Sequence, residues 1–265
     1  MTKTIILIPS RLGASRLPNK PLLKINNKPL ISHVYNKGQS AKIGEVYVAT
    51  GDKEIFDEVI KNNGKCILTT KDHLTGTDRI YEAFENLNLN DVDYIINLQG
   101  DEPLIETKDI INLNYFAIQK NSEIATLACK LDRKNIDNKN VVKVICDQNL
   151  EINKFASAKM FLRQLNVEKY ENIYHHIGIY IYKVSALKKL NLDIDDTYID
   201  FSPLLSIKGA VGNIQREVIE EIQMSIVKEG WFLDIYNQIE SDFKDYSTNK
   251  ILRIDENLID QIDSE

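Results

Sequence analysis

Three cations stand close together after the first apolar run of the chain. Arg11, Arg16 and Lys20 lie in "SRLGASRLPNK", residues 10–20. An Arg offers a planar fork for pairs of oxygen atoms and a Lys offers a compact point charge, so the loop suits an anion such as phosphate. Prolines on both sides of Lys20 restrict the backbone around it. The spacing alone leaves two interpretations: a phosphate-binding loop, or a solvated basic loop held by surface acids.

The usual glycine motifs for binding phosphate are absent from the sequence. Neither G-x-G-x-x-G nor G-x-x-x-x-G-K-[ST] occurs. These motifs hold phosphates largely with backbone amides at the start of a helix. If the first loop binds phosphate, its side-chain cations must therefore do most of the work.

A second polar group follows the fourth apolar run, in "NLQGDEPLI". Gly100 permits a close approach of the backbone, and Asp101 can hold a hard divalent cation, which takes one or two carboxylates plus phosphate oxygens. Alone, Gly-Asp-Glu-Pro is also ordinary turn chemistry. Combined, the two groups suit a nucleoside triphosphate with Mg²⁺ and a nucleotidyl transfer, which needs mainly positioning and charge neutralisation.

The alternation of hydrophobic periods predicts the elements that position these groups. In the first half, short β-branched runs typical of strands alternate with segments whose apolar residues recur every three or four positions, such as Ile55, Val59 and Ile60. This predicts an α/β fold with a mostly parallel central sheet and helices on both faces. Ligands of such sheets bind beyond the carboxyl ends of the strands. The expected strands are 4–9, 45–50, 65–69, 93–99, 123–131, 140–146 and 174–182, and the expected helices are 29–41, 52–63 and 77–88.

Composition limits the class of protein. The chain has 265 residues and a net charge of -6, which argues against general nucleic-acid binding. Three well-separated cysteines in apolar runs predict buried free thiols. No cationic leader and no apolar run of membrane-spanning length is seen, so we expect a cytoplasmic protein that does not associate with membranes. We expect one domain, 1–265, with a nucleotide-binding half, 1–120, and an acceptor-sugar and dimerisation half, 121–265.

Several segments together resemble the 3-deoxy-manno-octulosonate (Kdo) cytidylyltransferases, also called CMP-Kdo synthetases. They are "IPSRLGASRLPNKPL", "HLTGTDRIYEA", "NLQGDEPLI", "VVKVICD" and "HHIGIYIY", in the order of that family across residues 3–190. The resemblance implies a nucleotide-diphospho-sugar transferase fold, Rossmann-like with three layers. It also implies CMP transfer from CTP to an acidic 3-deoxy-ulosonic sugar, with Mg²⁺, for lipopolysaccharide or capsule synthesis, and a homodimer.

The resemblance also implies roles for individual residues. Arg11 and Lys20 would grip the triphosphate and, with Asp101, carry catalysis, while His176 would face the acceptor sugar. Asp101 would be one metal ligand, and Asp234 in "GWFLDI" is our choice for the second, ahead of Asp255. The nucleotide-binding set is Ser10, Arg11, Leu12, Lys20, Thr77, Asp78, Arg79 and Gln99.

Two segments on the acceptor side depart from the family pattern. In residues 153–163 the serine–arginine pair of the family is replaced by Ser157 and Ala158, with Lys159 next. Residues 202–223 lack the family string that helps to bind the acceptor and build the dimer. CTP use is therefore better supported than Kdo use. A hexose-1-phosphate nucleotidyltransferase and a non-catalytic nucleotide-binding relative stay as alternatives.

Overall fold

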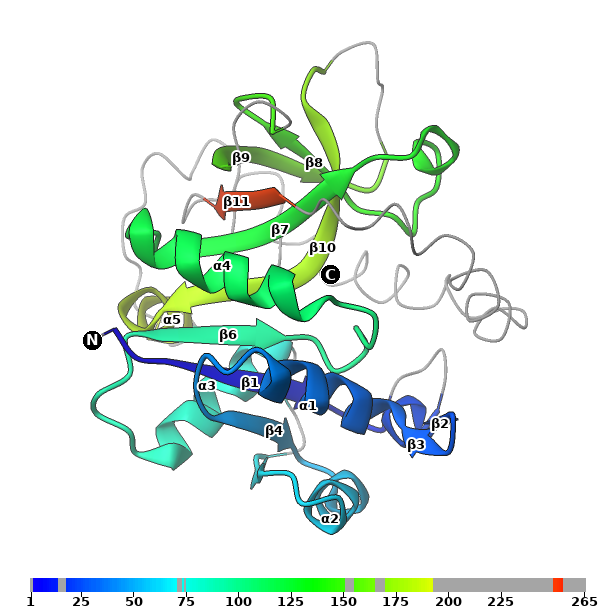
Figure 1. The fold of residues 1–265 in the computed structure, drawn as a ribbon, viewed down its shortest axis with the longest axis vertical. Coiled ribbons are helices and arrows are strands. Elements are labelled where there is room, and N and C mark those ends of the chain that lie inside the picture. The colour runs from blue at the N-terminus through cyan, green and yellow to red at the C-terminus, as the bar shows by residue number, and fades with distance from the viewer. Residues whose placement is uncertain are drawn as a thin grey trace.

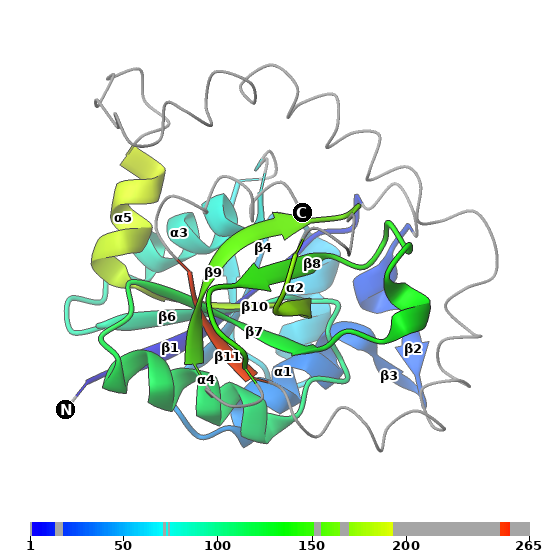
Figure 2. The ribbon, with the colours of Figure 1, turned by 90° about the horizontal axis from the view of Figure 1, so that it is seen from above.

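A computed structural model shows how the strands and helices are arranged. It describes residues 2–13, 18–70, 73, 75–150, 155–164, 170–192 and 250–254. Within them, one nine-stranded sheet has the order β5-β4-β1-β6-β10-β7-β11-β9-β8 (Figure 1). Helices cover both faces of this sheet (Figure 2), so the predicted α/β fold is confirmed.

Four strands from the first half of the chain form a parallel block. Their order, β5-β4-β1-β6, means that the chain adds strands on one side of β1 and then crosses to its other side. The switch point lies between β1 and β6, and this is where ligands of such sheets bind. The bounds are β1 Thr4–Ser10, β4 Val46–Thr50, β5 Cys66–Leu68 and β6 Tyr94–Leu98.

The remaining strands form the mixed part of the sheet. β10 runs antiparallel between β6 and β7, so its first residues lie at the edge where β6 ends. β11 pairs antiparallel with β7 and parallel with β9. The bounds are β7 Ile124–Lys130, β8 Lys143–Cys146, β9 Phe155–Leu162, β10 Ile173–Lys183 and β11 Lys250–Ile254.

The helices divide between the two faces of the sheet. α1 Leu30–Ser40, α2 Lys53–Lys61 and α4 Thr107–Gln119 cover one face. α3 Gly76–Leu87 and α5 Val184–Leu192 cover the other. Short elements complete the described part: η1 Lys20–Leu22, η2 Arg133–Asn135, and the hairpin of β2 Lys24–Ile25 and β3 Lys28–Pro29.

The core consists of two layers, one on each face of the sheet. In β1, Ile5 and Leu7 join the layer under α3, whereas Ile6 and Ile8 join the layer under α1. All four are fully buried, as expected for a parallel strand covered on both sides. β1 is therefore rigid, and it places the first loop at the edge of the sheet.

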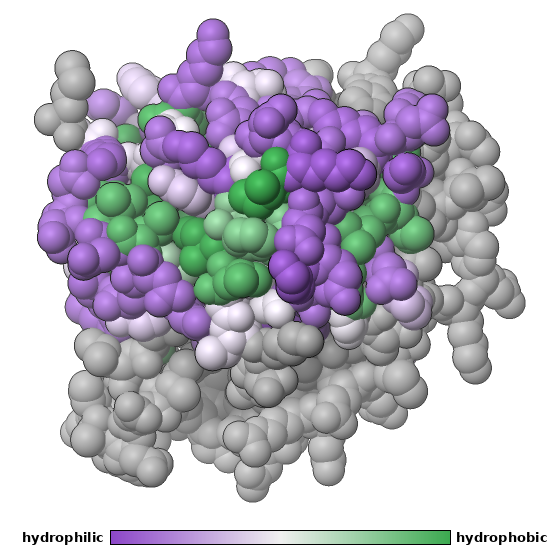
Figure 3. All heavy atoms as spheres, turned by 90° about the horizontal axis from the view of Figure 1, so that it is seen from below, coloured by the Kyte–Doolittle hydropathy of each residue, from purple (hydrophilic) through white to green (hydrophobic). Residues whose placement is uncertain are grey.

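One residue of the apolar stripe expected on the 52–63 helix is not buried. Ile55 and Val59 of α2 are buried, but Ile60 is 47% exposed. The next position around a helix turns away by about 100°, so Ile60 leaves the buried stripe. Leu68 of the edge strand β5 is also exposed. α2 lies at the bottom of Figure 1, and the face seen from below carries a hydrophobic area within a hydrophilic surface (Figure 3).

The three cysteines are free thiols, as predicted, and Cys129 and Cys146 are also buried as predicted, whereas Cys66 is only half-buried. Burial raises the pKa of each thiol to about 12, which makes them poor nucleophiles. No helix in the described part of the chain has both the length and the apolar character needed to span a membrane.

Candidate active site

The candidate active site lies where β1 and β6 end side by side. β1 pairs in parallel with β6, and Gly100 follows β6 by two residues. A Cβ atom at Gly100 would lie 2.7 Å from the carbonyl oxygen of Pro9, so only glycine allows this approach. The two loops predicted to do chemistry therefore start from adjoining backbone segments.

The first loop is tied down at Leu12. The Leu12 N–H donates to Oδ2 of Asp52 at 2.8 Å, and its carbonyl oxygen accepts from the N–H of Asn19 at 3.3 Å. Asn19 has a left-handed backbone, with φ of 60°, a conformation that Asn tolerates better than most residues. Arg11, before Leu12, is exposed. Arg16 lies outside the described residues.

The second loop meets the first through an ion pair. Nζ of Lys20 lies 2.8 Å from Oδ2 of Asp101. The side chains are 26% and 54% exposed, respectively, so solvent and ligands can reach the pair. Lys20, a cation that suits phosphate, and Asp101, a carboxylate that suits a metal, thus lie in contact at the switch point.

Glu102 is a second carboxyl group at this spot, and the sequence analysis assigned it no role. Burial, followed by the charge of Asp101, raises the pKa of Glu102 to about 8, while Lys20 opposes the shift. Its Oε1 would lie 3.8 Å from a Cβ atom placed at Gly178 of β10. Glu102 therefore faces the strand that carries His176. The only feature of the sequence that points to Glu102 is its place directly after Asp101 in "GDEP".

Helix α3 begins beside the same two loops. A Cβ atom at Gly76 would lie 3.2 Å from Cγ of Pro9 and 3.7 Å from Oε1 of Gln99. Thr75 and Asp78 form a capping box, in which the Asp78 carboxylate accepts the N–H of Thr75 at 3.0 Å. Asp78 thus fixes the start of the helix, and its side chain binds backbone of its own turn.

Thr77 and Arg79 are buried on α3. The Thr77 hydroxyl lies 3.4 Å from the hydroxyl of Tyr182 in β10. Nη1 of Arg79 donates to Oγ1 of Thr69 at 2.6 Å and to the carbonyl of Thr70 at 3.1 Å. Burial lowers the pKa of Arg79; the charge of Asp52 opposes this and that of Arg11 adds to it. Arg79 therefore holds the segment before α3 and lies in the electrostatic field of the first loop.

Gln99 is half-buried and is oriented by a residue that the sequence analysis did not single out. Nε2 of Gln99 donates to Oδ1 of Asn97 at 3.2 Å, and Asn97 is only 1% exposed. With Nε2 turned inward, Oε1 points toward the start of α3. Asn97 on the buried face of β6 therefore sets which end of the Gln99 amide faces the site.

His176 enters the sheet at the same edge but is largely buried. Its Nε2 lies 3.0 Å from the Thr126 hydroxyl, which donates its one hydrogen to the carbonyl of Ile179 at 2.6 Å. Nε2 is therefore the donor in its own contact. The ring also packs edge-on against Phe161, with centroids 5.0 Å apart. A contact of His176 with a sugar stays a prediction.

The donor atoms at Asp101 fit a hard divalent cation. Within the described residues, no group of three or more His, Cys, Asp or Glu side chains could hold a metal. Mg²⁺ does not need one, because it commonly takes one or two carboxylates and completes its shell with phosphate oxygens and water. Asp234 and Asp255 lie outside the described residues, so the second ligand stays a prediction.

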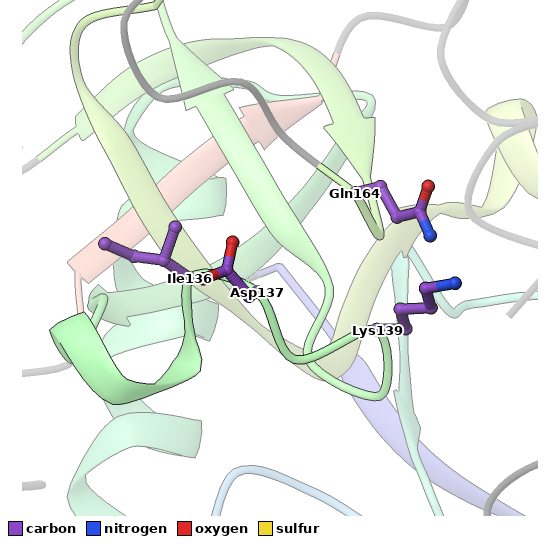
Figure 4. Close-up of a pocket in the computed structure, with 4 residues that line it drawn as sticks. All are labelled: Ile136, Asp137, Lys139 and Gln164. Atoms are coloured by element: carbon purple, nitrogen blue, oxygen red, sulfur yellow. The ribbon is translucent and has the colours of Figure 1, made fainter.

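A pocket of about 260 Å³ lies in the second half of the chain. Its lining residues are Ile136, Asp137, Lys139 and Gln164 (Figure 4). Beside it, the buried ammonium of Lys143 donates to the carbonyls of Asn138 and Arg163. Asn138 lies between the lining residues Asp137 and Lys139, and Arg163 precedes Gln164. Lys143 therefore links the two segments that line the pocket.

Comparison with known proteins identifies the family. The cytidylyltransferase family model matches residues 5–238. A 3-deoxy-manno-octulosonate cytidylyltransferase of Thermodesulfovibrio yellowstonii is 41% identical over 196 residues, 70% of this chain and 77% of that protein. One from Brucella ovis is 40% identical over 190 residues, 71% and 75% of the two chains.

A solved structure agrees with these relatives. A CMP:2-keto-3-deoxy-manno-octonic acid synthetase complexed with CTP superposes with a TM-score of 0.66 and 28% identity, covering 96% of this chain and 89% of that one. The family resemblance inferred from the sequence motifs is thus confirmed. The chain belongs to the cytidylyltransferase family and, within it, to the 3-deoxy-manno-octulosonate cytidylyltransferases.

Proposed function

We propose that this protein transfers CMP from CTP to the anomeric hydroxyl of Kdo, releasing pyrophosphate. The observation that carries the proposal is the Lys20–Asp101 pair at the β1–β6 switch point, in a chain 41% identical to a 3-deoxy-manno-octulosonate cytidylyltransferase. A cation and a carboxylate in contact can separate to bind a phosphate and a metal, respectively. The relative solved with CTP supports the choice of nucleotide.

The first loop binds the triphosphate. Arg11 and Lys20 neutralise phosphate oxygens, and Ser10 and Leu12 line the nucleotide from the end of β1. Arg11 is exposed and Lys20 is partly so, which leaves both side chains open to an incoming anion. Positive charge held in place ahead of the reaction stabilises the charge that develops on the leaving pyrophosphate.

The start of α3 supplies the nucleoside side of the site. Thr77, Asp78, Arg79 and Gln99 gather there, and the capping box and the Arg79 hydrogen bonds keep this end of the helix in place. Oε1 of Gln99 is a hydrogen-bond acceptor that faces the same space. Such an acceptor suits the amino group of cytosine and not the carbonyl that uracil carries there.

Asp101 and Asp234 would hold Mg²⁺, and the metal would neutralise phosphate charge when bound. This assignment is supported by the oxygen donor and partial exposure of Asp101. Asp101 lies next to Gly100, whose packing against Pro9 fixes its backbone.

The acceptor enters from the second half of the chain. The anomeric oxygen of Kdo attacks the α-phosphorus of CTP, the bond to the β-phosphate oxygen breaks, and pyrophosphate leaves with that electron pair. The hydroxyl proton passes to solvent or to a nearby base. His176 would orient the sugar from the start of β10, which lies beside the Gln99–Glu102 turn.

The direct test is turnover with defined substrates. We expect CTP, Mg²⁺ and Kdo to give CMP-Kdo and pyrophosphate in equal amounts, measured by phosphorus NMR. UTP in place of CTP, and glucose-1-phosphate in place of Kdo, serve as controls and should give little product. Absence of product with Kdo and a panel of other ulosonic acids, in a protein that still binds CTP, would contradict the proposal.

We further propose that the protein acts as a homodimer in the cytoplasm, and that its product serves lipopolysaccharide or capsule synthesis. The family membership supports all three statements. Size-exclusion chromatography with light scattering tests the first, and a monomer at working concentration would contradict it.

A further inference from the structure

Asp52 uses its side chain in an unusual way for its position. It stands at the N-cap of α2, where an Asp ordinarily accepts hydrogen bonds from the first turn of its own helix. Here the side chain makes no such cap, and Oδ2 instead accepts the N–H of Leu12 at 2.8 Å. The carboxylate thus connects the end of β4 to the first loop, 40 residues earlier.

Asp52 binds Leu12, the residue whose carbonyl oxygen joins the two ends of the first loop. Both backbone groups of Leu12 are engaged, the N–H by Asp52 and the carbonyl oxygen by the N–H of Asn19. Arg11 directly precedes Leu12, and Lys20 directly follows Asn19. One carboxylate therefore fixes, through two successive hydrogen bonds, the backbone that carries both cations of the loop.

The charge of Asp52 does not explain its place here. A carboxylate near a triphosphate site repels the substrate, so charge alone would weaken binding. Its negative charge is balanced in part by Arg79, which is buried and feels the fields of both Asp52 and Arg11. What remains useful to the site is the accepting oxygen that holds Leu12.

We propose that Asp52 is a positioning residue for the triphosphate, acting through Leu12 on Arg11 and Lys20. This inference rests on the proposed function, because it assumes that these two cations bind CTP. Ordering them before the substrate arrives lowers the entropy that binding must overcome.

Two substitutions separate the hydrogen bond from the charge. Asp52→Asn keeps an accepting oxygen and removes the charge, so we expect CTP affinity equal to or above that of the unmodified protein. Asp52→Ser keeps a favourable N-cap for α2 but lacks the oxygen that reaches Leu12. We expect it to weaken CTP binding by up to about tenfold, the effect of losing one hydrogen bond.

The matched control is Asp57→Ser on the same helix. Asp57 pairs with Lys53 of α2 at 3.1 Å and is exposed, so its loss should leave CTP binding unchanged. Calorimetric titration with CTP and Mg²⁺ gives the dissociation constants without any acceptor sugar. Thermal unfolding of each variant shows whether a weakened affinity comes with a loss of fold.

A double-mutant cycle with Arg11→Ala tests the route through the loop. If Asp52 acts by positioning Arg11, the two losses are not additive, and Arg11→Ala should cost much less affinity in the Asp52→Ser background. Additive losses, equal weakening by Asp52→Asn and Asp52→Ser, or unchanged binding in Asp52→Ser would each overturn the inference. Failure of the unmodified protein to bind CTP would instead refute the proposed function.

Discussion

Lys20 and Asp101 form an ion pair in which each neutralises the charge of the other. Both are partly exposed, and ion pairs of this kind contribute only about 0–1 kcal/mol to stability. Under the proposed function, this low cost lets the pair open, so that Lys20 can contact a phosphate and Asp101 a metal. The pair also balances charge beside the carboxyl group of Glu102, which is only partly exposed.

Lys20→Ala should slow CMP transfer far more than it weakens the fold. We expect a loss of about 2–4 kcal/mol of transition-state stabilisation, that is, a fall of about 30-fold to 10³-fold in kcat/KM for CTP. The free energy of unfolding should change by less than about 1 kcal/mol. Lys3→Ala is the control, because it breaks an equally short pair, Lys3–Asp91 at 2.7 Å, away from the site. Equal activity losses in the two variants would argue against a phosphate contact of Lys20.

Asp101→Asn should abolish the metal-dependent reaction and leave the circular dichroism spectrum unchanged. The amide keeps the shape of the side chain but provides a weaker, uncharged ligand for a divalent cation. Mn²⁺ binding in the presence of CTP, followed by electron paramagnetic resonance, gives a readout that does not need turnover. Near-normal rates in this variant would show that Asp101 is not a metal ligand.

The strand ends determine how well these groups are held. The loops after β1, β4 and β6 all leave the same edge of the parallel block. The end of β1 and the turn after β6 touch at Pro9 and Gly100. A buried parallel strand is a rigid base, because both faces are packed and its ladder bonds are paired on both sides. Precise placement of the cations thus depends on close packing of β1 against the turn after β6.

Gly100→Ala should therefore damage both stability and activity. The added methyl group would lie 2.7 Å from the Pro9 carbonyl oxygen, a backbone atom that cannot move without shifting the end of β1. We expect a loss of about 1–3 kcal/mol in the free energy of unfolding, as for other overpacked sites. Among the described residues, no atom lies within 4 Å of a Cβ placed at Gly13, so Gly13→Ala should change the free energy of unfolding by less than about 0.5 kcal/mol. Equal stability of the two variants, measured by urea unfolding, would contradict this.

Regular elements were predictable where the local pattern agrees with the final packing. The strand and helix periods located β1, β4, β5, β6 and α1 to α3, because one face or both faces of each are apolar. α4 was not predicted, since it mixes a buried Asp109 with exposed Ile111 and Tyr115. β9, "FASAKMFL", carries small residues and gains its strand character from pairing with β8 and β11.

The same reasoning explains which site residues could be predicted. Arg11, Lys20 and Asp101 follow parallel strands, so topology alone brings them to one edge. Asp52 and Asn97 could not be assigned, because their roles depend on hydrogen bonds to Leu12 and Gln99 that no local pattern encodes. The metal role of Asp234 stays a prediction, since it lies outside the described residues.

The two halves of the chain share one sheet through β10. This strand lies between β6 and β7 and brings His175 and His176 to the edge that carries Asp101. His175 is half-buried, and its pKa is lowered to about 4, mainly by burial and then by the charges of His176 and Lys143. His175 is therefore neutral in the folded protein near pH 7.

The stability of the protein should reflect this neutral histidine. The unfolded chain binds the His175 proton near pH 6.5 and the folded protein near pH 4, so acidification favours unfolding within that interval. The free energy of unfolding should therefore decrease as the pH is lowered from about 6.5 to about 4. This group contributes at most about 1.4 kcal/mol per pH unit to that decrease. His175→Gln should remove that part of the slope. Urea unfolding at several pH values checks this, and identical slopes in both proteins would contradict it.

The most direct test of the site is a crystal structure of the protein with CTP and Mg²⁺. We expect density for the triphosphate between Arg11 and Lys20, a metal on the Asp101 carboxylate, and an opened Lys20–Asp101 pair. A nucleotide bound away from the β1–β6 switch point, with that ion pair intact, would contradict the proposed site and the mechanism built on it.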